Sequence, residues 1–336
     1  MGATLLRRTF SAAAIVLCCV LCCLGSPAHC AGIQLLDSNP NLAGAIWYPC
    51  AGEPKAFPLG NLAVAADFGL MAVKDCPVTE AKLPLVIFSH GRSGWFGANH
   101  DTAEALADAG FVVAAINHPG DNGNDSSRRD DLSVFGSRPV DIVRLLDFLM
   151  HDWKDKAVID PARIGFFGFS KGGYTGLVLM GVTPDFGRLA SFCTEKAAVC
   201  EQLHNGETLP SPPHDARIQA AVIADAAPVN AFTRDNLAAI KIPLQFWRSE
   251  RGGPGVGDGS GDARIAHSLS GKPDIHVVPA GHFAFLAPCS PRLAAALPRI
   301  CTDNPPGFDR SAFHRDFNAS VIEFFREHLA GDGEVR

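Results

Sequence analysis

The chain has 336 residues, of which 47% are hydrophobic and 19% charged, and its formal net charge is −6. This composition is typical of a globular protein and excludes a disordered or fibrous chain. The charged residues form no basic block or stripe, so we expect no nucleic-acid partner.

Residues 1–30 predict a secretory signal peptide. Two arginines precede the apolar run 11–24, and small residues follow it, with cleavage expected near Cys30 or Ala31. The run is shorter than the roughly 20 residues that a membrane-spanning helix needs, so no stable membrane anchor is expected after signal removal. The arginine pair leaves Sec and twin-arginine export open. The remaining residues, 31–336, are expected to form a single periplasmic or secreted domain.

The cysteines support export. Eleven are present, and the six outside the signal and its edge fall into three pairs that are close in sequence. We predict the disulfides 50–76, 193–200 and 289–301, which are typical of an oxidising compartment. A metal site is the alternative, but these six cysteines form no CxxC motif and no histidines stand at ligand spacing beside them.

Short β-branched runs then alternate with helical segments. This alternation predicts an α/β fold with a mostly parallel central sheet and helices on both faces. The strands expected at 217–225, 242–250 and 274–282 each end on a polar residue, at the sheet edge where open α/β sheets place their ligand sites. The expected strands are 83–90, 111–120, 163–170, 217–225, 242–250 and 274–282, and the expected helices are 101–110, 137–153 and 171–181.

Two insertions interrupt the alternation. Residues 119–139 read as a polar loop, and about 181–216 read as a helical excursion with two cysteines and a proline-rich end. We expect both to lie over the active edge, the second as a lid closed by a disulfide.

The stretch RIGFFGFSKGGYTG, residues 163–176, allows two interpretations. A phosphate loop needs GxxxxGK followed by Ser or Thr, and Ser170 and Gly172 occupy two positions where that pattern requires other residues. The alternative pattern Gly-x-Ser-x-Gly is met by Gly168, Ser170 and Gly172 between a predicted strand and a predicted helix. It predicts that Ser170 is a nucleophile on a sharp, strained turn.

A serine nucleophile needs a base, because its hydroxyl is protonated and unreactive at neutral pH. His282 follows the last predicted strand and is the expected base. Asp225 ends an earlier strand and is the favoured acid, which would hold the imidazole in one tautomer. Glu250 stays open as the alternative, because Gly252 stands in the turn where an aspartate is expected.

The oxyanion of the tetrahedral intermediate needs two backbone donors. We expect one from the N–H of Lys171, directly after the nucleophile, and the other from Arg92 in the turn SHGRSGWFG. On this interpretation Lys171 contributes its backbone and not its ammonium group.

The motifs FSHGRSG, GFSKGG, ADAAP and GHFAFLAPC resemble those of secreted α/β-hydrolases related to dienelactone-hydrolase-like proteins and to platelet-activating-factor acetylhydrolase. The resemblance implies an α/β-hydrolase fold. In the acetylhydrolase the acid stands at a position similar to Asp225, whereas many dienelactone-hydrolase-like relatives carry it one strand later, where this chain has Gly252. Dienelactone hydrolase uses a cysteine nucleophile, so ring opening of dienelactone is not carried over to Ser170.

We therefore predict an exported serine hydrolase that cleaves small-molecule or lipid-like carboxylic esters through an acyl-enzyme, with the triad Ser170, Asp225 and His282. No metal or organic cofactor is expected. The alternatives are an amidase or peptidase with the same triad, and a non-catalytic binding protein on the same fold. Aromatic residues near the turns indicate an apolar acyl pocket, namely Trp95, Phe96, Phe169, Trp247, Phe283 and Phe285.

Overall fold

The computed structural model describes residues 30–330 except 40, 65–68, 79 and 195. The predicted signal peptide therefore lies outside the described residues, apart from Cys30, which begins the first strand. Among the described residues, no helix combines the length and apolar character needed to cross a membrane.

A mixed sheet of ten strands forms the centre of the molecule, in the order β10-β9-β8-β7-β5-β6-β2-β1-β4-β3. All neighbours from β10 to β6 are parallel, and β2 is antiparallel to both β6 and β1. The strands are β1 (Cys30–Leu36), β2 (Gly44–Cys50), β3 (Lys55–Pro58), β4 (Gly69–Lys74), β5 (Leu83–Ser89), β6 (Val112–Ile116), β7 (Ile159–Phe169), β8 (Ile218–Ala224), β9 (Leu244–Ser249) and β10 (Asp274–Val278).

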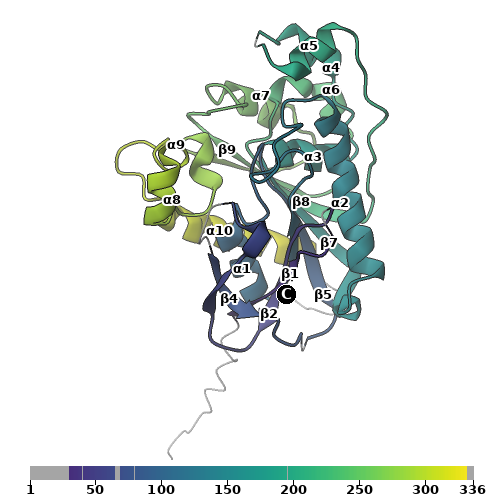
Figure 1. Ribbon diagram of the computed structural model, residues 1–336. Helices are drawn as coiled ribbons and strands as arrows, with labels where there is room; N and C mark the ends of the chain where they lie inside the picture. Colours follow the sequence, from purple (N-terminus) through teal and green to yellow (C-terminus); the bar gives the residue numbers. More distant parts are fainter. Residues whose placement is uncertain (1–29, 40, 65–68, 79, 195, 331–336) are drawn as a thin grey trace, which may run out of the picture.

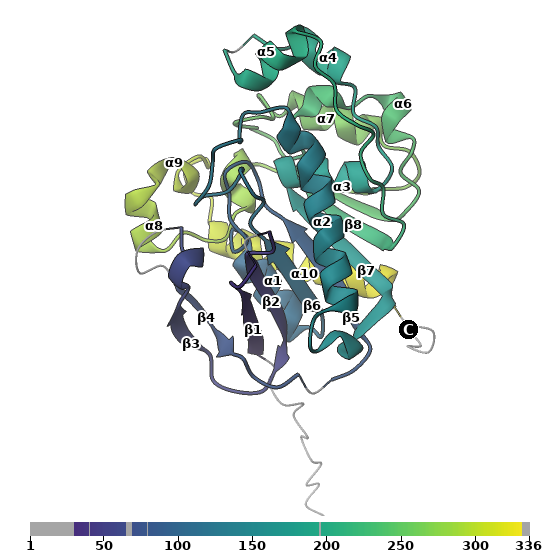
Figure 2. The ribbon, with the colours of Figure 1, turned by 45° about the vertical axis from the view of Figure 1, so that its right-hand side comes forward.

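Helices cover both faces of this sheet (Figures 1 and 2). The α-helices are α1 (His100–Asp108), α2 (Ser133–His151), α3 (Lys171–Leu179), α4 (Phe186–Ser191), α5 (Ala198–His204), α6 (Arg234–Leu237), α7 (Ser260–Ser268), α8 (Pro291–Ala296), α9 (Pro298–Cys301) and α10 (Arg310–His328). Short 3-10 turns are η1 (Gly60–Leu62), η2 (Lys156–Val158), η3 (Val229–Ala231) and η4 (His282–Phe285).

Two hydrophobic clusters hold these layers together. In one, side chains of α2 and α3 pack on one face of the central strands, and in the other, α1 and α10 pack on the opposite face. Every residue of β5 is buried, which agrees with its continuous apolar sequence, because a parallel strand covered on both faces needs no alternation. The predicted α/β fold with a mostly parallel sheet is confirmed.

Some predicted boundaries were wrong. The loop predicted at 119–139 ends at residue 132, because α2 begins at Ser133 and not at 137. Leu132, Val134 and Phe135 are buried, so core packing extends the helix into the polar stretch. Strand β6 ends at Ile116 and β10 at Val278, four residues before the predicted ends in each case. Strands β1 to β4 were not predicted.

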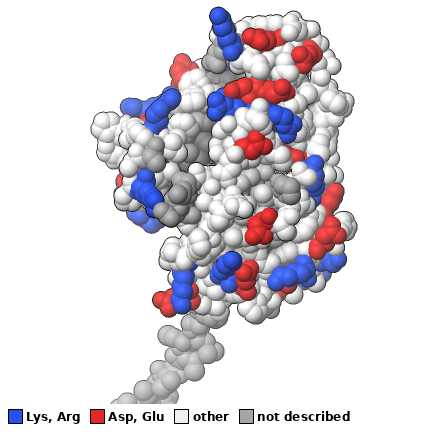
Figure 3. Space-filling view, viewed as in Figure 1, with Lys and Arg blue, Asp and Glu red and all other residues white. Residues whose placement is uncertain are grey.

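The three predicted disulfides, Cys50–Cys76, Cys193–Cys200 and Cys289–Cys301, are all present. The second joins Cys193, just after α4, to α5 within the excursion 181–216, at the top of Figure 1. The backbone N–H of Val199 in α5 donates to the Asp130 carbonyl at 2.7 Å, so the two predicted insertions contact each other. On the face drawn in Figure 3, positive and negative side chains are interspersed, with no continuous basic stripe.

Candidate active site

Ser170 lies in the turn between β7 and α3, with φ of 56° and ψ of −119°. A positive φ at a residue with a side chain is strained, and the surrounding structure has to enforce it. Both flanking glycines are required by close packing. A Cβ at Gly172 would stand 1.8 Å from the Ser89 carbonyl oxygen, and one at Gly168 would stand 2.4 Å from the Gly172 carbonyl oxygen. The packing of this turn therefore explains the Gly-x-Ser-x-Gly pattern.

His282 begins the 3-10 turn η4 after β10. Its Nε2 lies 3.0 Å from the Ser170 Oγ, and its backbone N–H donates to the Gly252 carbonyl at 2.7 Å. The ring packs on Phe169, with 4.7 Å between ring centroids. The backbone hydrogen bond to Gly252 and the ring contact with Phe169 thus hold the imidazole in place.

Asp225 follows β8 with a φ of 45°. Its Oδ2 lies 2.9 Å from His282 Nδ1, and the backbone N–H and hydroxyl of Ser249 donate to its two oxygens at 2.7 and 2.5 Å. Asp225 is completely buried, and Ser170 and His282 are nearly so. The structure therefore brings the three predicted residues into one chain of hydrogen bonds.

Glu250, the alternative acid, is exposed, and no hydrogen bond joins its side chain to His282 in the described part of the chain. Gly252 cannot carry an acid in this loop conformation. Its φ is 64°, and a Cβ there would stand 2.2 Å from the Gly257 carbonyl oxygen. The glycine that stands in the expected acid position instead supplies the carbonyl that holds His282.

Asp262 is a second buried carboxyl whose charge interacts with that of Asp225. It lies in the first turn of α7, fully buried. Burial raises its pKa well above the ordinary value, and the charge of Asp225 raises it further. The raised pKa favours the protonated form of Asp262, so a second negative charge beside Asp225 is disfavoured.

The two predicted oxyanion donors stand in turns next to Ser170. Gly91 lies close to the nucleophile turn, because a Cβ at Gly91 would stand 3.2 Å from the Cβ of Ser170. Lys171 is the first residue of α3, so its N–H has no acceptor within the helix. The next residue of the other turn, Ser93, has a φ of 51°, so that turn is also strained.

The Lys171 side chain has contacts that sequence reasoning missed. Its ammonium is buried, 3.1 Å from Asp121 Oδ2 and 2.9 Å from the Arg129 carbonyl oxygen. It also stands 5.0 Å from the centre of the Phe135 ring. Burial lowers the pKa of Lys171 to about 8. The ammonium therefore connects the nucleophile turn, the turn around Ser170 between β7 and α3, to the loop before α2.

Three further supporting residues, Ser249, Asp303 and Arg138, were also missed. Asp303 accepts the Phe283 N–H at 2.6 Å, so it supports the turn that carries His282. Of the aromatic residues predicted to form an acyl pocket, Trp247 and Phe285 instead pack against Phe313 and Phe317 of α10.

A cavity of about 310 Å³ lies in the excursion and is lined by Leu132, 183–186 and 207–212. No triad residue lines it. Within the described ranges, no group of three or more histidine, cysteine, aspartate or glutamate residues is arranged to hold a metal ion.

The parallel sheet, the strained serine turn and the histidine after the last strand define a class of protein: the chain has the α/β-hydrolase fold. Residues 62–128 match the family model of platelet-activating factor acetylhydrolase, isoform II, in agreement with the resemblance noted from the motifs. The structure is also similar to that of a ferulic acid esterase from Streptomyces cinnamoneus, with a TM-score of 0.59, 20% identity and 91% of each chain covered. No curated protein sequence matches the chain.

Proposed function

We propose that this chain is a serine hydrolase that cleaves carboxylic esters through an acyl-enzyme. The observation that carries the proposal is the chain of hydrogen bonds from Ser170 through His282 to Asp225 at the carboxyl edge of the sheet. The match to an acetylhydrolase family and the structural similarity to an esterase support ester hydrolysis.

In the proposed reaction, Ser170 Oγ attacks the ester carbonyl carbon while His282 Nε2 takes the hydroxyl proton. Asp225 keeps Nδ1 protonated and stabilises the imidazolium. The backbone N–H groups of Arg92 and Lys171 donate to the oxyanion. His282 then protonates the leaving alcohol, and water, activated by the same imidazole, hydrolyses the acyl-enzyme.

Covalent labelling tests this proposal. A fluorophosphonate probe should label the wild-type protein, and Ser170→Ala should abolish labelling and lower p-nitrophenyl ester hydrolysis by about 10⁴-fold or more. The matched control is Ser211→Ala, an exposed serine in the excursion, which should label like wild type. Absence of wild-type labelling would favour the alternative of a non-catalytic binding protein.

A substrate panel distinguishes an esterase from an amidase or peptidase. Esters of increasing acyl chain length and one anilide of the same acyl group are compared at equal concentration. We expect ester cleavage to exceed amide cleavage by at least about 100-fold, because nothing beyond His282 is assigned to protonate a poor amine leaving group. A faster anilide reaction would move the assignment to an amidase.

We also propose that the protein is exported to the periplasm or secreted. Its three disulfides are typical of an oxidising compartment. N-terminal sequencing of the protein from its native source should give a mature start near Cys30 or Ala31. A retained Met1 in a reduced cytosolic fraction would contradict export.

A further inference from the structure

The peptide group that joins Gly91 to Arg92 is held from its carbonyl side. The Gly91 carbonyl oxygen accepts from His90 Nδ1 at 2.7 Å, from Arg138 Nη2 at 3.0 Å and from the Gly94 N–H at 3.1 Å. In a trans peptide the carbonyl and the following N–H point in opposite directions. Three donors on the Gly91 carbonyl therefore fix the direction of the Arg92 N–H.

Arg138 is the centre of this arrangement. Its side chain is completely buried in α2, and its Nη1 also donates to the His90 carbonyl at 2.7 Å. A planar guanidinium holds several acceptors in fixed relative positions, which a lysine at the same place cannot do. Arg138 thus binds two consecutive carbonyl groups of the turn SHGRSGWFG, residues 89–97, which carries Arg92 and is called the oxyanion turn below.

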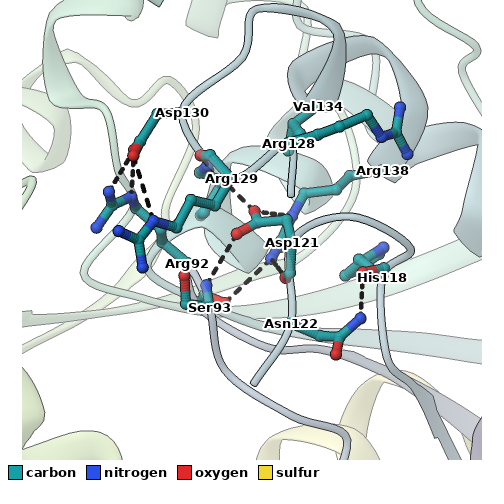
Figure 4. Close-up of polar contacts among 12 residues, drawn as sticks. Arg92, Ser93, His118, Asp121, Asn122, Arg128, Arg129, Asp130, Val134 and Arg138 are labelled. Carbon is teal, nitrogen blue, oxygen red and sulfur yellow. Dashed lines mark hydrogen bonds and ion pairs between the residues drawn. The ribbon is translucent and has the colours of Figure 1, made fainter. Parts of the chain in front are cut away.

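Asp121 connects this turn to the nucleophile turn, as Figure 4 shows in part. Its Oδ2 is 3.0 Å from Arg138 Nε and 3.1 Å from the Lys171 ammonium, and its Oδ1 accepts the Ser93 N–H at 2.9 Å. Asp121 is completely buried, and Arg138 and Lys171 hold its pKa below the ordinary value although burial opposes this. The Asp121 carboxylate therefore links Ser93, the residue after Arg92, to the side chain of Lys171.

The environment of the neighbouring histidines disfavours their charged form. Burial lowers the pKa values of His90 and His118 well below the ordinary value, and the charge of Arg138 lowers them further. The buried cluster of Asp121, Arg138 and Lys171 thus contains two cations and one anion directly behind the proposed oxyanion site. Fixed charge in such a desolvated place acts on a developing anion more strongly than it would in water.

We infer that Arg138 and Asp121, with the Lys171 ammonium, are positioning residues that hold the Arg92 and Lys171 N–H groups in the geometry that binds the oxyanion. This inference rests on the proposed function. It adds a support for the two donors that is separate from the Ser170, His282 and Asp225 chain. None of the three charged groups needs to touch the substrate.

The test compares a tetrahedral analogue with a ground-state ligand. A trifluoromethyl ketone adds reversibly to a serine hydroxyl and forms an oxyanion, whereas the corresponding secondary alcohol cannot. In Arg138→Met we expect kcat and trifluoromethyl ketone affinity to fall together by about 10- to 100-fold, while alcohol affinity and KM change less than about threefold. Arg138→Lys should recover part of the loss.

The control for the loss of an arginine ion pair is Arg217→Met. Arg217 pairs with Asp215 and Asp147 near the start of β8 and contacts neither turn, so its loss should leave both affinities unchanged. Asp121→Asn, which keeps side-chain size, replaces Arg138→Met if that variant does not fold, and the same paired loss is expected. Thermal unfolding confirms that each variant is folded.

Equal losses for the ketone and the alcohol in a folded variant, or no loss for either, would overturn the inference. Both results leave the proposed function intact, provided that the wild type is labelled by the fluorophosphonate. Failure of wild-type labelling is a failure of the proposed function itself.

Discussion

At the scale of single residues, Asp225 is the best-supported carboxylate of the site. Three hydrogen bonds from Ser249 and His282 reach its two oxygens, and it is completely buried. An aspartate with a positive φ of 45° is unusual, so the turn after β8 is strained in order to aim this side chain at the imidazole.

We predict that Asp225→Asn lowers kcat for a p-nitrophenyl ester by about 10³- to 10⁴-fold, because an amide NH2 facing Nδ1 donates to it and favours the wrong tautomer, and the neutral amide does not stabilise the imidazolium. Glu250→Gln is the matched control, and its exposed side chain predicts a change below about twofold. Steady-state kinetics at pH 8 check both variants. A larger loss in Glu250→Gln would move the acid role to that residue.

Ser249 supports the acid, and its hydroxyl can be removed alone. We predict that Ser249→Ala lowers kcat about 10-fold, since a hydrogen bond to a buried charge contributes about 1.5 to 3 kcal/mol, and the backbone N–H still holds Asp225. An unchanged kcat in Ser249→Ala would show that the backbone donor is sufficient.

At the scale of elements, the turn from β7 into α3 is where packing is tightest. We predict that Gly172→Ala destabilises the protein by at least about 3 kcal/mol, because its Cβ would overlap the backbone of β5 and neither strand nor helix can move aside cheaply. Urea unfolding measures this loss.

Gly187→Ala is the control, since Gly187 is also the second residue of a helix but has only an ordinary contact, 3.5 Å from the Asp185 side chain. Replacing this exposed glycine with alanine should stabilise the protein by about 0.5 to 1 kcal/mol. Similar destabilisation in both variants would show that helix position, and not the contact with β5, decides the outcome.

Burial explains why strands β5 and β7 were predicted and β3 and β4 were not. Strand β5 and the last part of β7 are continuous apolar runs, which indicate strands covered on both faces. Strand β4 has two exposed ends and β3 only one partly buried residue, so their patterns carried little signal.

In the candidate site, too, some residues could be predicted from local sequence and others could not. Ser170 and His282 stand in local motifs, and Asp225 ends a predicted strand. The side chains that hold the oxyanion turn, SHGRSGWFG, stand in no such motif, because Asp121 reaches Ser93 across 28 positions of sequence and Arg138 reaches His90 across 48. Such contacts depend on how α2 packs on the sheet, which no local pattern encodes.

At the scale of the whole molecule, the segment closed by Cys289–Cys301 supports the turn that carries His282. Arg310 of α10 donates to the Ile300 carbonyl at 2.8 Å and pairs with Asp303 at 3.1 Å, and Asp303 accepts the Phe283 N–H. A disulfide, an ion pair and a backbone hydrogen bond thus form one continuous support from α10 to η4.

We predict that the double variant Cys289→Ala/Cys301→Ala loses about 3 kcal/mol of stability, from the loop entropy released in the unfolded chain. It should also lower kcat, because the segment that carries Asp303 is less constrained. The control is Cys193→Ala/Cys200→Ala in the excursion, which should lower stability but leave kcat within about twofold. Equal effects of both variants on kcat would contradict a specific support of η4.

The buried histidines give the whole molecule a dependence on acid. Because folding lowers the pKa values of His90 and His118, the unfolded chain binds more protons below about pH 6.5, and stability falls as pH falls. Asp141 opposes this, since burial raises its pKa to about 6 and the folded state takes up a proton there. Asp262 and Asp303 oppose it as well, because burial also raises their pKa values.

We therefore predict the contribution of one histidine. Between pH 7 and pH 5, the stability of His118→Gln relative to that of the wild type should rise by about 1 to 2 kcal/mol, because the variant lacks an imidazole whose pKa folding lowers. Urea unfolding of both proteins at the two pH values measures this difference. A difference that does not change with pH would mean that the His118 imidazole is charged in the folded protein, contrary to its burial beside Arg138.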